Sequence, residues 1–147
     1  MPKISEKQGP VAKTLEVVGD RWTILILQEL LRGKHRFAEL KDSVEGIASN
    51  ILSDRLKILE HFGIVERKFY SEHPPRAEYH LTRRGHELGV VTGALAVWGA
   101  KYLSDSGALI HIECGSRMNV VYYCPTCSIQ VAGAQVRLVE ASGTSAE

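Results

Sequence analysis

The sequence comprises 147 residues, of which 44% are hydrophobic, and its formal net charge is +1. This composition suits one domain with its own hydrophobic core plus an appendage, and the balanced charge means that any surface for an anionic partner must come from local clustering of basic residues. The apolar run from Thr23 to Leu31 is far shorter than the roughly 20 residues that a membrane-spanning helix needs, and residues 1–7 lack a signal-peptide core, so we expect a cytoplasmic protein without membrane contact.

The N-terminal third of the chain predicts a helical scaffold. We expect residues 1–9 to be flexible and residues 11–18 to form a short helix that ends at Gly19. Asp20 then caps a second helix that closes at Gly33. Its core-facing residues are Trp22, Leu25, Ile26, Leu30 and Leu31. No catalytic constellation is visible, and we predict that the protein is not an enzyme.

Residues 36–61 predict a helix-turn-helix. Phe37, Leu40 and Val44 share one face of a helix over residues 36–44. Residues 45–47 supply a tight turn in which Gly46 permits an unusual backbone conformation, and Ser49 is well placed to cap a second helix that runs to about His61. Such a pair places its second helix in the major groove of DNA.

The second helix of this pair has a polar face suited to base edges. With Asn50 as reference on a helical wheel, polar side chains lie within roughly 60° of it, and the apolar side chains lie opposite. The polar residues are Ser53, Asp54, Lys57 and His61; the apolar ones are Ile51, Leu52, Leu56, Ile58, Leu59 and Phe62. We predict that Ser49, Asn50 and Ser53 contact DNA at or near base edges, and that Lys57 and Arg36 contact phosphates or neighbouring bases.

Arg55 is the exception on this helix, because the wheel places it inside the apolar arc. A half-buried guanidinium requires a carboxylate partner, and Glu29 and Glu39 are the candidates. We therefore expect loss of Arg55 to damage folding before it damages specificity.

Two β-prone runs, residues 64–70 and 77–81, predict a hairpin wing joined by a loop at residues 71–76. His73 and Arg76 flank the two prolines of this loop with donors suited to phosphate or minor-groove contact. For an isolated loop, a plain solvated hairpin would be the alternative. Basic residues nevertheless gather in and beside this region: Lys34, Arg36, Lys57, Arg67, Lys68 and Arg76.

Beyond the wing, Thr82 is expected to cap one long helix that runs to about Leu103. Five large apolar residues recur along it at steps of three and four: Leu88, Val91, Leu95, Trp98 and Tyr102. A second apolar strip, with Val90, Ala94 and Val97, lies beside the first, so the helix must bury one strip outside its own domain. We predict a homodimer that reads an inverted repeat with half-sites about 34–36 Å apart, and a small-molecule effector pocket at its interface.

The three cysteines of the chain lie in a separate motif. His111 and Cys114 form one pair spaced by three residues, and Cys124 and Cys127 form another. Together they offer the four nitrogen and sulfur ligands that structural zinc prefers, and no open coordination position remains for hydrolytic chemistry. A disulfide would leave one cysteine unpaired and is disfavoured in a reducing cytosol, whereas a redox pair at Cys124 and Cys127 remains an alternative. We predict a minimal zinc ribbon over residues 109–139, followed by a disordered tail over residues 140–147.

Several motifs in this order resemble the HxlR family of transcriptional regulators. They are residues 12–27, residues 36–40, residues 50–56 and residues 73–79. The resemblance covers roughly residues 10–103 and implies a cytoplasmic, dimeric, MarR-like DNA-binding regulator without enzymatic activity. The C-terminal extension, residues 109–139, resembles that of a subset of such regulators. Many members carry a cysteine where this chain has Gly9, so a thiol sensor there is not carried over.

The expected fold is α+β, mainly α with a small β-wing: a winged helix-turn-helix and dimerisation domain over residues 10–103, then the zinc ribbon. The expected function is sequence-specific transcriptional regulation on double-stranded DNA. The alternative is a winged-helix adaptor that binds proteins through its wing and ribbon. The donor-rich face at Asn50, Ser53 and Lys57 favours DNA.

Overall fold

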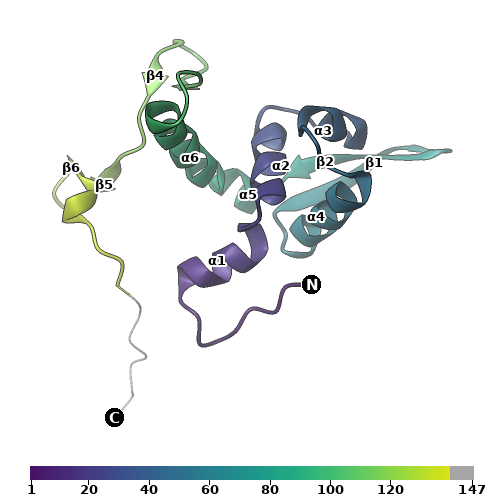
Figure 1. Cartoon of the computed structure of the whole chain (residues 1–147), viewed down its shortest axis with the longest axis horizontal. Coiled ribbons are helices and arrows are strands. Elements are labelled where there is room, and N and C mark those ends of the chain that lie inside the picture. Colours follow the sequence, from purple (N-terminus) through teal and green to yellow (C-terminus); the bar gives the residue numbers. More distant parts are fainter. Residues whose placement is uncertain (140–147) are drawn as a thin grey trace. The chain divides into compact units, whose positions relative to one another are not determined.

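The computed structural model describes residues 1–139, which fall into two compact units divided after Thr92. The first unit holds four helices, a hairpin and a short helix in the order α1 (Pro10–Val18), α2 (Arg21–Leu31), α3 (Phe37–Ser43), α4 (Ser49–His61), β1 (Val65–Glu72), β2 (Pro75–Leu81) and α5 (Arg83–Glu87) (Figure 1). The predicted tail at residues 140–147 lies outside the described residues. Within residues 1–139, no helix is long and apolar enough to cross a membrane.

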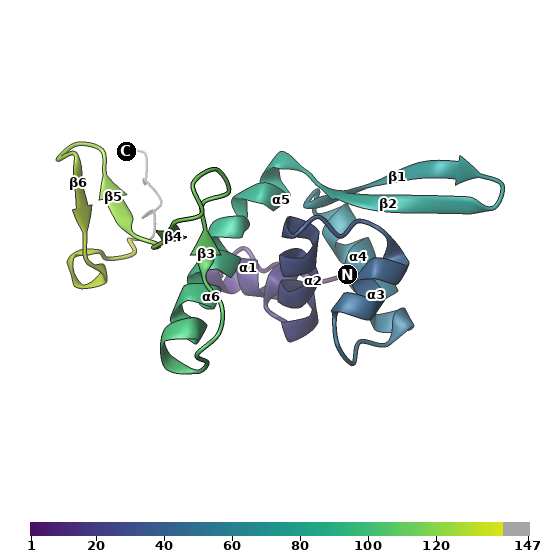
Figure 2. The same cartoon turned by 90° about the horizontal axis from the view of Figure 1, so that it is seen from above.

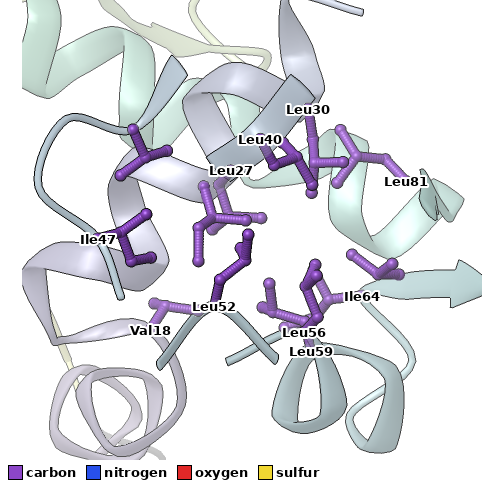
Figure 3. Packing of buried hydrophobic residues seen from close by; sticks show 13 residues of the cluster. Val18, Leu27, Leu30, Leu40, Ile47, Leu52, Leu56, Leu59, Ile64 and Leu81 are labelled. Carbon is purple, nitrogen blue, oxygen red and sulfur yellow. The ribbon is translucent and has the colours of Figure 1, made fainter. Parts of the chain in front are cut away.

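Thirteen buried hydrophobic residues form the core of the first unit (Figure 3). They come from all four helices, from both strands and from the turns between them. The set is Val18, Ile26, Leu27, Leu30, Leu40, Val44, Ile47, Leu52, Leu56, Leu59, Ile64, Val65 and Leu81. Leu52, Leu56 and Leu59 follow the helical repeat and are at most 1% exposed, so one face of α4 is fully committed to this core.

Local signals set the starts of α2 and α3. The Asp20 carboxylate accepts from the backbone N–H groups of Trp22 (3.0 Å) and Thr23 (3.1 Å), which confirms its predicted role as the cap of α2. At α3, Glu39 Oε2 accepts from the backbone N–H groups of His35 (3.0 Å) and Arg36 (2.9 Å). These contacts satisfy donors that a helix start otherwise leaves unpaired.

Arg55 has a carboxylate partner, but neither predicted candidate is correct. Its Nε lies 3.4 Å from Asp20 Oδ1, with both side chains about one third exposed (33% and 29%). Glu29 pairs with Arg32 on its own helix, and Glu39 caps α3. Arg55 Nε makes no hydrogen bond within residues 1–139, so its link to Asp20 is an ion pair without donor alignment.

The single helix predicted after Thr82 is wrong, because the chain forms α5 and then α6 (Gly89–Tyr102) with a break at Leu88. Thr82 caps α5 by accepting from the backbone N–H of Gly85 at 3.2 Å. The N–H of Leu88 then donates to the carbonyl of Gly85, only three residues back, and Gly89 follows with its low helix propensity. This tight turn ends α5.

The second unit contains most of α6 and an extension built from short strands. The strands are β3 (Leu109–Ile110), β4 (Arg117–Met118), β5 (Tyr122–Cys124) and β6 (Ile129–Val131), followed by a 3₁₀ turn, η1 (Gly133–Gln135). β3 pairs with β4 and β5 pairs with β6, both antiparallel. The Leu109 side chain lies against the buried Gly93 of α6, where a Cβ would come within 3.0 Å of it. The segment predicted to be a zinc ribbon, residues 109–139, therefore contains two separate hairpins.

Candidate nucleic-acid interface

The polar face predicted for the second helix of the pair is the solvent-facing side of α4. Ser49, Asn50 and Lys57 are exposed, and Ser53 is half-buried. The leucines of the opposite face lie in the core, which holds this face toward solvent (Figure 3). Asp54 is also exposed on α4 and adds one negative charge there. The arrangement presents short polar donors and acceptors flanked by a cation, as reading of base edges requires.

Ser49 does not cap α4, contrary to the prediction. It is the first helical residue, and Ala48 occupies the N-cap position with extended backbone angles (φ −78°, ψ 147°). Gly46, at φ +79°, makes the predicted turn, but the chain enters the helix one residue earlier than expected. Ser49 consequently lies beside Asn50 on the exposed first turn of α4.

The wing is a longer hairpin than predicted. β1 and β2 pair from Val65 with Leu81 out to Glu72 with Pro75, so only His73 and Pro74 form the turn. A register shift between Phe69 and Ser71 accommodates the extension. His73 and Arg76 are exposed at its tip, and the hairpin projects well beyond α3 and α4 (Figure 2).

Two wing aromatics were not singled out from the sequence. Phe69 and Tyr70 are 59% and 46% exposed. The guanidinium of Arg67 lies 5.2 Å from the Phe69 ring centroid, and that of Arg36 lies 4.9 Å from the Tyr70 centroid. The sequence could have indicated this exposure, because adjacent strand residues point to opposite faces of the sheet. At least one of two neighbouring aromatics must therefore point away from the core.

Half of the predicted basic cluster is paired within the protein. Arg36, Arg67 and Lys68 lie 3.3, 3.7 and 2.8 Å from Glu78, Glu60 and Glu66, respectively. Lys34, Lys57 and Arg76 have no carboxylate partner in the described part of the chain. Lys34, Lys57 and Arg76 therefore remain available to a partner.

Arg36 has intramolecular partners that the sequence did not predict. Its Nε donates to Glu78 Oε1, and His80 Nε2 lies 3.1 Å from Glu78 Oε2. Hydrogen bonds from His80 and then Arg36 hold the pKa of the Glu78 carboxyl below its usual value. The Arg36 side chain, at 55% exposed, remains accessible from outside.

An apolar cavity of about 390 Å³ lies between α1, the end of α4 and α5. Val17, Phe62 and Leu88 contribute to its apolar walls, and Lys13 and Arg84 contribute cations. Its size falls in the range of small-molecule pockets, roughly 300–1,000 Å³. Phe62 caps the C-terminus of α4, so the cavity borders the helix that carries the polar face.

Four of the five predicted interface residues are exposed on α6: Val91, Leu95, Trp98 and Tyr102, at 42%, 52%, 56% and 60%. Leu88 precedes α6 and packs, half-buried, against the core of the first unit. Val90, in the second predicted strip, is 66% exposed. So broad an apolar surface on one helix is typical of a face that another chain covers.

Each predicted metal-ligand pair forms its own tight turn. His111 Nδ1 lies 3.1 Å from Cys114 Sγ, and Gly115 follows at φ +69°. Ser128 follows Cys127 at φ +55°, the same left-handed conformation in a residue that rarely adopts it. Hydrogen bonds from Ser116 and His111 lower the pKa of the Cys114 thiol to about 7. Within residues 1–139, no three metal-binding side chains come together in one group, so the structure does not unite the two pairs.

Comparison with known proteins places this geometry in a family. A family model described as HxlR-like helix-turn-helix matches residues 17–107. An uncharacterized HTH-type transcriptional regulator of Mycobacterium tuberculosis (strain CDC 1551 / Oshkosh) is 36% identical over 130 residues, covering 86% of this chain and 82% of that protein.

Two solved structures of candidate transcription factors are also similar. PA1607 has a TM-score of 0.78 at 28% identity, covering 91% of this chain and 96% of that one. PA1374 from Pseudomonas aeruginosa has a TM-score of 0.67 at 31% identity, covering 95% of each chain. The chain belongs to the HxlR-like helix-turn-helix family.

Proposed function

We propose that the protein is a sequence-specific transcriptional regulator that binds an inverted-repeat operator as a homodimer. The observation that carries this proposal is the division of α4 into a buried leucine face and an exposed face with Ser49, Asn50 and Lys57 beside a projecting wing. Such a helix fits the major groove while the wing reaches the adjacent backbone. The names of its relatives as HTH-type transcriptional regulators support this function.

The proposed contacts divide into reading and anchoring. Asn50, with Ser49 and Ser53 beside it, is assigned to base edges, where an amide can pair with adenine. Lys57, His73 and Arg76 are assigned to phosphates or the minor groove. The exposed α6 residues Val91, Leu95, Trp98 and Tyr102 are assigned to the symmetry mate, since burial against water would stabilise such apolar surface.

Selection of bound duplexes from a random DNA pool tests the function directly. Sequencing the duplexes that the protein retains at near-physiological salt is expected to enrich an inverted repeat with half-sites about one helical turn apart. Sedimentation of the protein–DNA complex then gives two chains per duplex. A folded protein that enriches no sequence would contradict the proposal and favour the adaptor function, in which the exposed wing aromatics and the extension contact a protein.

Substitutions at Asn50 and Arg76 are expected to have different effects. Asn50→Ala should relax preference at particular base pairs by about 1–3 kcal/mol and leave the salt dependence unchanged. Arg76→Ala should weaken binding to all sequences and reduce the slope of log affinity against log salt by about 0.9. Binding titrations at several salt concentrations, on the selected operator and on single-base variants, measure both. An identical loss at every sequence with one unchanged slope would refute this division.

We further propose that His111, Cys114, Cys124 and Cys127 bind one structural zinc ion. The two tight turns supply imidazole and thiolate ligands, with left-handed residues directly after Cys114 and Cys127. The lowered pKa of the Cys114 thiol favours the thiolate that metal binding needs. When bound, the ion would clip the β3–β4 hairpin to the β5–β6 hairpin.

Chelation of zinc is expected to unfold the extension locally and leave the first unit intact. The hairpins β3–β4 and β5–β6 are short and largely exposed, so they lack a core of their own. Elemental analysis should find equimolar zinc in the purified protein, and hydrogen exchange should rise after chelation only beyond α6. Cys124→Ser should lose the metal, whereas the control Ser128→Gly should keep it because glycine adopts the left-handed conformation readily. Folded protein without zinc, indifferent to chelator, would disprove the site.

The cavity beside Phe62, rather than the dimer interface that the sequence suggested, is the proposed place for a small-molecule effector. Its apolar walls and the cations Lys13 and Arg84 suit an amphipathic anion. A ligand that binds only one position of Phe62 would shift the end of α4, and the operator affinity would change by the ligand's differential binding free energy.

A further inference from the structure

The segment just before α3 lies along the outer edge of the wing. The backbone N–H of Tyr79 donates to the carbonyl of His35 at 2.8 Å, and Arg36 forms an antiparallel bridge with Glu78. Glu78 also pairs with Lys68 of β1, so β2 runs between β1 and this segment. The wing is thereby tied to the helix-turn-helix at a point about 40 residues distant in sequence.

Four side chains close around this bridge, and we call them the wing joint: His35, Arg36, Glu78 and His80. Glu78 holds Arg36 Nε through Oε1 at 3.3 Å and His80 Nε2 through Oε2 at 3.1 Å. The His35 and His80 rings stack with centroids 4.4 Å apart, and His35 Nδ1 lies 3.2 Å from the carbonyl oxygen of Tyr79. Glu78 thus connects both sides of the joint with one carboxylate.

The length of the wing makes the geometry of this joint important. β1 continues for four residues beyond Lys68, the partner of Glu78, which at about 3.3 Å per residue is roughly 13 Å from the joint to the tip. A rotation of about 10° at the joint would move the tip by roughly 2 Å over that distance, more than a hydrogen bond tolerates. His73 and Arg76 lie at that tip, so their proposed contacts with DNA depend on the angle of the hairpin.

We propose that Glu78 is the positioning residue of the wing: by holding Arg36 and His80 it sets the angle at which the hairpin meets DNA. Arg36 then acts through this pairing and through its packing over Tyr70, rather than as a separate phosphate contact. This inference rests on the proposed DNA-binding function. It replaces the phosphate role that the sequence suggested for Arg36.

An alternative role for Glu78, as a competitor of DNA for Arg36, predicts the opposite change in DNA affinity. If Glu78 only competes with DNA for Arg36, its neutralisation releases a cation to the phosphates. Glu78→Gln would then bind DNA more tightly and show a steeper salt dependence. If Glu78 positions the wing, the same substitution weakens operator binding and makes its salt dependence shallower, because Arg76 at the displaced tip loses its phosphate contact.

A double-mutant cycle distinguishes the two models. Glu78→Gln and Arg36→Gln should each lower affinity for the selected operator by about tenfold, and the double variant should lose little more than either, because both break one interaction. Hydroxyl-radical footprints should lose protection at the wing while keeping it in the major groove. Glu16→Gln is the matched control, since it removes the same negative charge from an exposed position on α1 that makes no ion pair within residues 1–139. Melting temperatures show that each variant remains folded.

A measurement on the protein alone separates failure of the joint from failure of DNA binding. Backbone ¹⁵N relaxation should show greater motion of residues 71–76 in Glu78→Gln and Arg36→Gln than in the wild type or Glu16→Gln, and faster amide exchange at Tyr79. An unchanged wing in both variants would overturn the proposal even if the operator is bound. Tighter binding by Glu78→Gln, or losses that multiply in the double variant, would also overturn it. A mobile wing in a protein that selects no operator would preserve the joint and reject the DNA-binding function.

Discussion

Leu56→Ala is expected to lower the free energy of unfolding by about 2–5 kcal/mol, because it leaves a cavity where a fully buried side chain now packs. Leu56 is 1% exposed and lies in the core between the neighbouring α4 leucines Leu52 and Leu59 (Figure 3). Since domains of this size are stable by only about 5–15 kcal/mol, operator binding should weaken together with stability. Urea titration followed by circular dichroism measures the loss.

The matched control is the next residue along the same helix. Lys57→Ala removes an exposed side chain without opening a cavity, so its stability should stay within about 0.5 kcal/mol of the wild type while its DNA affinity falls. If Leu56→Ala were no less stable than Lys57→Ala, α4 would not be anchored through its leucine face.

Asp20→Ala is expected to cost about 1–3 kcal/mol, because the carboxylate serves two elements at once. It caps α2 through the N–H groups of Trp22 and Thr23, accepts from the Thr23 hydroxyl at 2.5 Å, and lies 3.4 Å from Arg55 Nε on α4. The cap supplies most of the effect, since Arg55 and Asp20 are both about one third exposed and water screens their attraction. Thermal denaturation at low and high salt measures both parts.

Asp20→Ser separates capping from charge pairing. Serine keeps an oxygen for the helix cap and removes the carboxylate, so this variant should recover most of the stability and lose only the salt-dependent part. Arg55→Met should likewise reduce the melting temperature. An Arg55 variant that keeps its melting temperature but loses DNA binding would show that Arg55 contacts DNA and is not a structural residue.

Features that depend on neighbouring residues could be predicted from the sequence. The apolar repeat of Leu52, Leu56 and Leu59 set the buried face of α4, since a helix turns by a constant angle per residue. Asp20 was correctly identified as a cap because its acceptor reaches N–H groups only two and three residues ahead. The turns at Cys114 and Cys127, which carry the proposed zinc ligands, are local in the same sense, as the left-handed residues after them show.

Features that depend on distant residues could not be predicted in this way. The sequence predicts a carboxylate partner for Arg55 and offers Glu29 and Glu39 as candidates, but the packing of α2 on α4 selects Asp20. The sequence predicts that Arg36 is a free cation, whereas in the folded chain it pairs with Glu78. The break at Leu88 is invisible to periodicity, because the apolar pattern continues through it while the hydrogen bonds shorten.

The chain alone therefore specified its element types, the exposed face of α4 and the family to which it belongs. These follow from helical and strand periods, caps and short motifs, all of which act over a few residues. The tertiary structure determines which charged residues pair and how far the wing projects. A charge pair depends on distances between side chains that are remote in sequence, and a one-dimensional pattern contains no such distances.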